Sequence, residues 1–283
     1  MSDLFINYKV SRENQRFYLN HQEIAGLQSI QPEINASYGP ILHLGLERTS
    51  TMLRGQSLGR LTTQSFLVNS DQFIGFTGAN PATGHLVFVE NAEAAGDGLI
   101  FNPLYLTSYN LKYTDNQIPE ITTSFNGYET FGQMVESERT ELASASLTPA
   151  NYSFLIPNRG SITITLDDLT NNRLISFDLN LEVPRTPIYI MGQLAPLRVD
   201  STPPITVSFS AQMELGRYTF KTLLNILNTK TVKEFTITCN DYRTDQLIKT
   251  YTFGNLELIN YSFTSSINDN IILSLQLRGF VDF

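Results

Sequence analysis

The sequence of 283 residues contains no tryptophan, one cysteine and three histidines, and only 16% of its residues are charged. The single cysteine, Cys239, excludes an intramolecular disulfide, and its place in the alternating run Phe235–Cys239 predicts a small buried side chain instead of a reactive thiol. No stretch approaches 18 consecutive apolar residues, and the N-terminus lacks the basic and apolar regions of a signal peptide. We therefore expect neither membrane insertion nor secretion.

The charge balance is acidic, with a net charge of −8 and a pI near 4.9. Most of the excess acid lies in residues 1–150, and the lysines and arginines are scattered instead of alternating with the aromatic residues. A protein that binds a phosphate backbone needs a basic surface, and one that binds single strands needs basic and aromatic residues together. The composition therefore argues against specific nucleic-acid binding.

The sequence offers no constellation of residues for catalysis. His21, His43 and His85 have no partner at metal-ligand spacing, and the motifs of serine hydrolases, zinc proteases and phosphate-binding loops are absent. Distant carboxylates suited to glycoside hydrolysis stay open at this point, but such sites usually include tryptophan platforms for the sugar. Asp167 and Asp168 lack the spacing of a calcium loop and are interpreted as a hairpin turn. We expect no enzyme, with no catalytic, cofactor-binding or metal-binding residue.

One pattern of 31 residues occurs twice without gaps, at 101–131 and again 152 positions later at 253–283. Ordinary residue usage gives about two identities over such a window. Seven positions are identical: Phe101/Phe253, Leu104/Leu256, Leu106/Leu258, Tyr109/Tyr261, Asn116/Asn268, Gly127/Gly279 and Phe131/Phe283. Any two β-hairpins share alternation and a turn, which is the alternative explanation. The matched ending of a glycine and an aromatic residue favours a tandem duplication.

The duplication predicts two domains, residues 1–135 and 151–283, with a connector at 136–150. Alternating apolar residues predict strands throughout, and a stripe at Phe220, Leu223, Leu224 and Leu227 predicts a helix packed on a sheet. The segment Arg48–Gly59 is rich in Ser, Thr and Gly and is interpreted as a loop. The expected fold is mainly β with one helix per half, as two pseudo-symmetric antiparallel barrels or sandwiches.

Several short segments resemble structural proteins of bacteriophage tails. They are Ile24–Ile30 with Tyr38-Gly-Pro-Ile41 and Leu44-Gly45, then Leu106–Tyr113 with Ile118–Phe125, and in the second half Pro187–Gly192 with Pro196, Val199 and Pro204. The resemblance spans most of the chain, although each motif is short. The segment Arg48–Gly59 departs most from the pattern of this family.

The resemblance implies tandem tail-tube-type β-barrel domains and a chain that forms rings with copies of itself. Three chains would then supply six barrels around a channel, as in a sixfold tail, and other tail, baseplate or sheath proteins would be partners. Double-stranded DNA would cross an acidic channel without specific binding, because like charges repel. The expected location is the virion, with assembly in the host cytoplasm. We expect contacts between subunits at the 40–60 and 133–150 segments.

A binding module remains the alternative to this structural function. Two β domains at the tail tip or baseplate would then recognise a host glycan or another virion protein. The lack of tryptophan and the internal duplication favour the ring-forming protein.

Overall fold

The computed structural model describes residues 15–41, 51–78, 80–88, 98–135, 137–138, 142, 154–191, 193, 195–202, 204–216, 219–265 and 270–281. The first half contains β1 (Gln15–Leu19), β2 (Gln22–Glu23), β3 (Leu27–Ile41), β4 (Thr51–Phe66), the 3-10 helix η2 (Ile74–Phe76), β5 (Ala82–Phe88), β6 (Gly98–Thr114) and β7 (Glu120–Gln133). The second half contains β8 (Ile162–Leu166), β9 (Leu169–Asn171), β10 (Leu174–Glu182), β11 (Arg185–Ile188), β12 (Arg198–Ser201), β13 (Ile205–Leu215), helix α2 (Thr219–Thr229), β14 (Thr231–Asn240), β15 (Leu247–Thr264) and β16 (Ile271–Val281).

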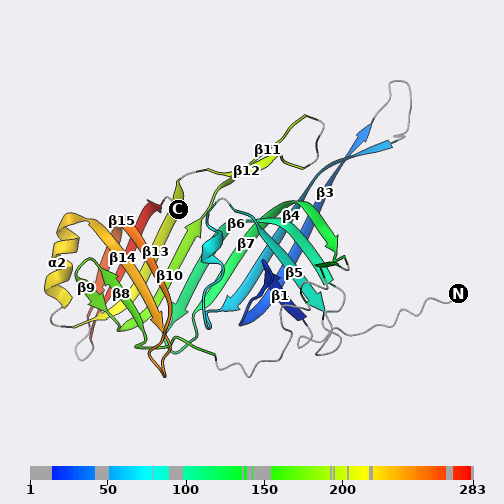
Figure 1. The fold of residues 1–283 in the computed structure, drawn as a ribbon. Coiled ribbons are helices and arrows are strands. Elements are labelled where there is room, and N and C mark those ends of the chain that lie inside the picture. The colour runs from blue at the N-terminus through cyan, green and yellow to red at the C-terminus, as the bar shows by residue number, and fades with distance from the viewer. Residues whose placement is uncertain are drawn as a thin grey trace.

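The fold is mainly β, as predicted, and every strand pair is antiparallel. Fourteen strands form one sheet, and β11 and β12 form a separate two-stranded hairpin. Figure 1 shows this sheet running across the whole molecule, with α2 at one end and the β3–β4 hairpin at the other. No sheet closes on itself among the described strands, so the structure does not show the barrels that we expected from the sequence.

The two halves contain units with the same strand order. The first unit, β1 to β7, has the order β2-β1-β5-β6-β7-β4-β3. The second unit, β8 to β10 with β13 to β16, has the order β9-β8-β14-β15-β16-β13-β10. The helices also correspond, because η2 connects β4 to β5 and α2 connects β13 to β14. The 31-residue repeat is therefore part of a correspondence between seven strands and seven strands.

The register of the strands agrees in the two units, down to a bulge. Leu106 pairs with Phe125 in β6–β7, and Leu258 pairs with Leu277 in β15–β16. In each hairpin the register shifts immediately after this pair, between Leu106 and Ser108 and between Leu258 and Asn260. A one-residue bulge rotates every following side chain to the other face of the sheet. The shared bulge therefore shows that both hairpins present equivalent residues to equivalent faces.

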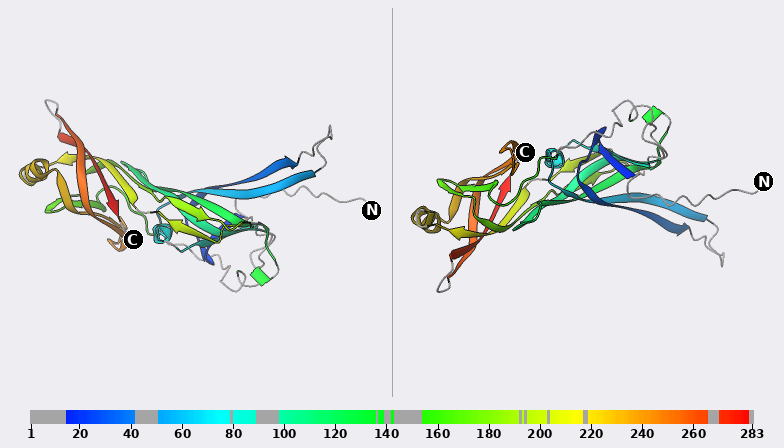
Figure 2. Two further views of the ribbon diagram at one scale, coloured as in Figure 1. Left: turned by 90° about the horizontal axis from the view of Figure 1, so that it is seen from above. Right: turned by 90° about the horizontal axis from the view of Figure 1, so that it is seen from below.

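Each unit also extends a hairpin arm from corresponding strands. The outer parts of β3 and β4 form the first arm, where Pro40 pairs with Met52. The hairpin β11–β12 forms the second arm, where Pro187 pairs with Val199, 147 positions later on both strands. The predicted loop at Arg48–Gly59 is wrong from Thr51 onward, because this segment is strand β4. Its polar residues gave no alternation signal, since the arm projects from the body of the sheet (Figure 2).

The larger of two hydrophobic clusters includes buried residues of both halves, and the smaller one contains Tyr18, Val87, Ile100, Met134 and Leu142. Alternation decides which face enters this core: Ile162, Ile164 and Leu166 of β8 are buried, whereas Thr163 and Thr165 between them are half-buried. Helix α2 confirms the helix predicted from the apolar stripe, and Leu223 and Ile226 bury its inner face. No helix in the described part of the chain is long and apolar enough to cross a bilayer.

The repeated glycine has a packing function in the first unit. Gly59 of β4 pairs with Gly127 of β7, and the ring of Phe131 lies over both. A Cβ at Gly127 would lie 2.2 Å from Cζ of this ring. We expect Gly127→Ala to lower the free energy of unfolding by about 2 kcal/mol, because the ring has to move out of its contact with Phe101. Urea denaturation measures the effect.

The matched control for this substitution is Gly132→Ala in the same strand. A Cβ at Gly132 meets nothing within 4 Å. The control should change the free energy of unfolding by less than about 0.5 kcal/mol. Equal effects of the two substitutions would contradict the packing function of Gly127.

Candidate interaction edges

The two units are joined edge to edge by β6 and β10. The N-terminal part of β6 pairs with β5, and its C-terminal part, from Ser108 to Thr114, pairs with β10. In this ladder Tyr109 lies opposite Leu181 and Leu111 lies opposite Leu179. All four side chains have 0% exposure. We call this contact the internal seam, and it makes one continuous sheet of the two units (Figure 1).

Both faces of the internal seam carry specific side-chain contacts. On the core face the rings of Tyr113 and Phe177 lie 5.6 Å apart. On the other face the side-chain amide of Asn110 donates a 2.7 Å hydrogen bond to Asp178 Oδ1. Paired aromatic rings and cross-strand hydrogen bonds each stabilise a sheet by several tenths of a kcal/mol. The register of the seam is therefore fixed by both faces.

A buried carboxylate, Asp71, binds residues of both units beside the seam. Its Oδ2 accepts hydrogen bonds from the hydroxyls of Tyr109 at 2.7 Å and Tyr251 at 2.9 Å, and its Oδ1 accepts from the Phe73 N–H at 2.9 Å. Burial, and next the charge of Asp71, raise the pKa of both tyrosines well above the usual value. The tyrosines therefore stay protonated and act as donors to the carboxylate.

Arg185, at the start of the second arm, holds this arm against the first unit. Its guanidinium donates to the carbonyl of Leu106 at 2.9 Å and to the carbonyls of Phe76 at 3.0 Å and Gly78 at 2.7 Å. Burial lowers the pKa of Arg185 from its usual value. Charged donors to backbone carbonyls are among the stronger hydrogen bonds in proteins, so the arm is bound firmly beside the seam.

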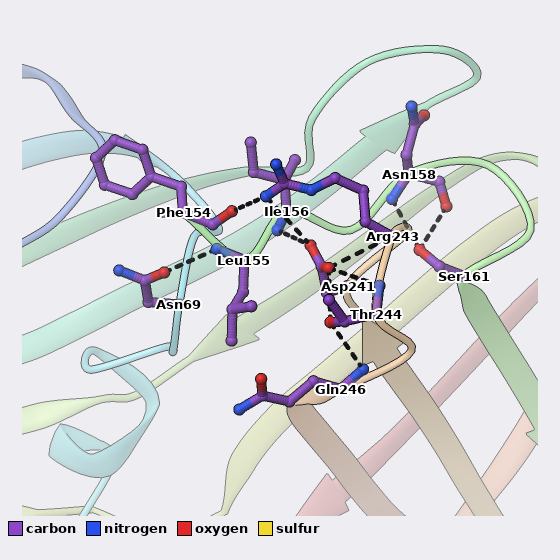
Figure 3. Close-up of polar contacts among 10 residues, drawn as sticks. All are labelled: Asn69, Phe154, Leu155, Ile156, Asn158, Ser161, Asp241, Arg243, Thr244 and Gln246. Carbon is purple, nitrogen blue, oxygen red and sulfur yellow. Dashed lines mark hydrogen bonds and ion pairs between the residues drawn. The ribbon is translucent and has the colours of Figure 1, made fainter. Parts of the chain in front are cut away.

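A short strap, residues 154–156, binds both units with polar contacts (Figure 3). On one side Leu155 and Asn69 exchange two hydrogen bonds, at 2.9 and 3.0 Å. On the other side Asp241 Oδ1 accepts from the Ile156 N–H at 2.8 Å, and Arg243 donates to the Phe154 carbonyl at 2.5 Å. The strap therefore fixes the start of the second half to the loop after β4 and the loop after β14.

Asp241 also accepts hydrogen bonds within its own turn, and these contacts lower its pKa. Its Oδ2 accepts from the backbone N–H and the hydroxyl of Thr244, at 2.9 and 2.8 Å. The hydrogen bond from the Ile156 backbone, followed by those from Thr244, lowers the pKa of Asp241 from 3.8 to about 2. Each hydrogen bond favours the ionised carboxylate, so the folded protein binds this proton less readily than the unfolded chain does.

The lowered pKa of Asp241 predicts how stability depends on pH. In the unfolded chain this carboxyl has its ordinary pKa of 3.8. Its contribution to stability is therefore fully present above about pH 4 and is lost as the pH falls through about 2. We expect the difference in urea midpoint between the wild-type protein and Asp241→Asn to be largest at neutral pH and to shrink between pH 4 and pH 2. A difference that stays constant over this range would show that the charge of Asp241 does not stabilise the fold.

The strands that correspond to the two seam strands, β10 and β6, lie at opposite ends of the molecule. Strand β3 corresponds to β10, and the C-terminal part of β15, residues 258–264, corresponds to the paired part of β6. Strand β3 pairs only with β4 among the described strands, and residues 258–264 pair only with β16. Figure 2 shows β3 in blue and β15 in orange at opposite ends of the molecule. We call these two segments the open edges.

Large apolar side chains lie exposed on the open edges. Ile34 of β3 is 55% exposed, and Tyr261 and Phe263 of β15 are 45% and 39% exposed. Their counterparts Leu181, Tyr109 and Leu111 are completely buried in the internal seam. Charged residues that usually protect an edge strand are scarce: Glu33 is the only one in residues 31–35, and residues 258–264 contain none. The open edges are therefore the strongest candidates for a functional surface.

The structure describes two of the three histidines and the single cysteine. The rings of His21 and His85 stack with centroids 5.2 Å apart, and His43 lies outside the described residues. Cys239 is buried, and burial raises the pKa of its thiol to about 12. No group of three potential metal ligands occurs among the residues that the structure describes.

Asp167 and Asp168 form a hairpin turn, as predicted. They connect β8 to β9, and Asp167 has the positive φ of 50° that such turns use. Asp167 Oδ1 accepts the backbone N–H groups of Lys233 and Glu234, both at 2.9 Å. The two residues line a shallow surface depression of about 540 Å³ beside α2. The carboxylate of Asp167 is thus used to hold β14.

Of the two expected contact segments, most of residues 133–150 and residues 42–50 lie outside the described part of the chain. No protein-family model matches the chain, and no curated protein sequence matches it significantly. The internal seam and the open edges are therefore the features of this chain that bear on its function.

Proposed function

We propose that the chain is a structural subunit of a bacteriophage tail, which assembles into rings that form or cap the channel for DNA. The observation that carries the proposal is the pair of corresponding units, joined by one seam and ending in two open edges of the same kind. A contact between two different patches of identical subunits produces a ring where the rotation closes, and a filament where it does not. The segments that resemble tail proteins support a location of this ring in a bacteriophage tail.

Three chains would give a ring of six units, which fits a sixfold tail. The net charge of −8 suits a channel that double-stranded DNA crosses without binding, and part of this charge would face the channel. Ring assembly would also cover the open edges, which are an aggregation hazard in a single chain. Stacking partners would be other tail, baseplate or sheath proteins, and the protein would reside in the virion after assembly in the host cytoplasm.

The mass of the purified protein in solution tests the proposal. One chain has a mass of 31.8 kDa, so light scattering should give three times this value, and negative-stain images should show rings or stacked rings. Binding of double-stranded DNA should be undetectable at physiological salt. A protein that stays monomeric at high concentration and binds a glycan would overturn the proposal in favour of a binding module.

A further inference from the structure

In the internal seam, an edge strand of the second unit, β10, pairs with a strand of the first unit, β6. The counterparts of these two strands are the open edges: β3 is the counterpart of β10, and residues 258–264 of β15 are the counterpart of the paired part of β6. Because these open edges lie at opposite ends of the molecule (Figure 2), they pair with each other only between different chains. The partner that fits each open edge is therefore the other open edge of a second copy of the chain.

The strand correspondences determine the register of such a contact. The repeated glycines Gly127 and Gly279 pair with Gly59 and Val207. Gly59 and Val207 lie opposite Ile34 and Leu181, so Leu181 of β10 is the counterpart of Ile34 in β3, 147 residues later. The paired part of β15 lies 152 residues after that of β6. The internal pair Leu181–Tyr109 thus becomes Ile34–Tyr261, and the polar pair Asn180–Asn110 becomes Glu33–Ser262.

We propose that β3 of one chain pairs antiparallel with residues 258–264 of β15 in the next chain, with Ile34 opposite Tyr261. This inference rests on the proposed ring assembly and names the surface that builds it. The contact continues the sheet of one chain into the next, as the internal seam does within a chain. It buries Ile34, Tyr261 and Phe263, which are otherwise the exposed counterparts of buried core residues.

One proline of β3 lies within the proposed contact. Pro32, the counterpart of Leu179, lies in β3 opposite Leu61. Proline has no N–H and occurs on edge strands instead of central ones in the sheets of single chains. In the proposed contact Pro32 lies opposite Phe263, so the new ladder has at most one donor fewer than the internal seam.

Disulfide crosslinking tests the register. The test variant carries Glu33→Cys and Ser262→Cys, both at exposed positions of the open edges. The internal control carries Asn110→Cys and Asn180→Cys, which occupy the corresponding positions of the seam. The off-register control carries Glu33→Cys and Asn260→Cys, where the diagonal separation of about 7–8 Å exceeds the reach of a disulfide. The native Cys239 is buried and remains in all variants.

Mild oxidation of the assembled test variant should link chains covalently, and a non-reducing gel should show multiples of the 31.8 kDa chain. The internal control should form its disulfide within one chain. The off-register control should give at least about tenfold less product, because its sulfur atoms do not meet.

Two outcomes separate failure of the register from failure of the ring. If light scattering shows rings and the internal control crosslinks while the test variant does not, the proposed contact is overturned and the ring is retained. If light scattering of the unmodified protein shows monomers alone, both proposals are overturned. Crosslinking of the off-register control as efficient as that of the test variant would also overturn the contact.

Discussion

Asp71→Ala is expected to lower the free energy of unfolding by about 3 kcal/mol, because two buried tyrosine hydroxyls lose their acceptor. Tyr109 and Tyr251 would keep only the 3.3 Å contact between their own hydroxyls. The Phe73 N–H would lose its acceptor as well. Urea denaturation followed by circular dichroism measures this difference.

The matched control for Asp71→Ala is Asp200→Ala. Asp200 forms a 3.1 Å ion pair with Arg198, but both side chains are largely exposed. Exposed ion pairs contribute less than about 1 kcal/mol, so the control should be close to neutral. An effect of Asp71→Ala no larger than that of Asp200→Ala would show that the network does not stabilise the fold.

Removing the hydroxyls singly and together tests whether the network links the two units. Tyr109 belongs to the first unit and Tyr251 to the second, and both donate to Asp71. We expect Tyr109→Phe and Tyr251→Phe each to cost about 1–2 kcal/mol, with a combined effect that differs from their sum. Simple additivity would show that the two hydroxyls act independently.

The sequence was sufficient for the elements whose pattern depends on local burial. The alternation in Ile162–Leu166 reflects one buried face, and the structure has β8 there. The stripe at Phe220–Leu227 predicted helix α2 but not its whole buried face, because Leu224 is 42% exposed and Ile226, outside the stripe, is buried. The repeat at 101–131 and 253–283 was visible because the same bulge and shared buried positions such as Leu104 and Leu256 constrain both hairpins. These features require no knowledge of distant partners.

The sequence did not identify the internal seam or the Asp71 network. Alternation shows that β6 and β10 each have a buried face, but it does not show which edge meets which strand. Asp71 is 180 residues from Tyr251, and an aspartate before a helical turn is typical of a cap. The open edges were equally hidden, because Ile34 and Tyr261 look like ordinary core residues until the structure shows them exposed.

Tyr261→Asp is expected to weaken assembly by about 100-fold or more, because ring formation would bury an unpaired charge opposite Ile34. The folding of the single chain should change little, since Tyr261 is 45% exposed before assembly. Analytical ultracentrifugation over a range of concentrations measures the loss of assembly, and circular dichroism verifies the fold.

The matched control is Tyr242→Asp, the same substitution at a tyrosine that is 53% exposed in the turn after β14, away from both open edges. It should assemble like the wild-type protein. A second substitution in the same chain then tests the register: Ile34→Lys alone should prevent assembly, and together with Tyr261→Asp it should restore much of it, because the lysine and the aspartate lie opposite each other across the contact. Equal loss of assembly in Tyr242→Asp and Tyr261→Asp, or no rescue by Ile34→Lys, would place the contact elsewhere on the chain.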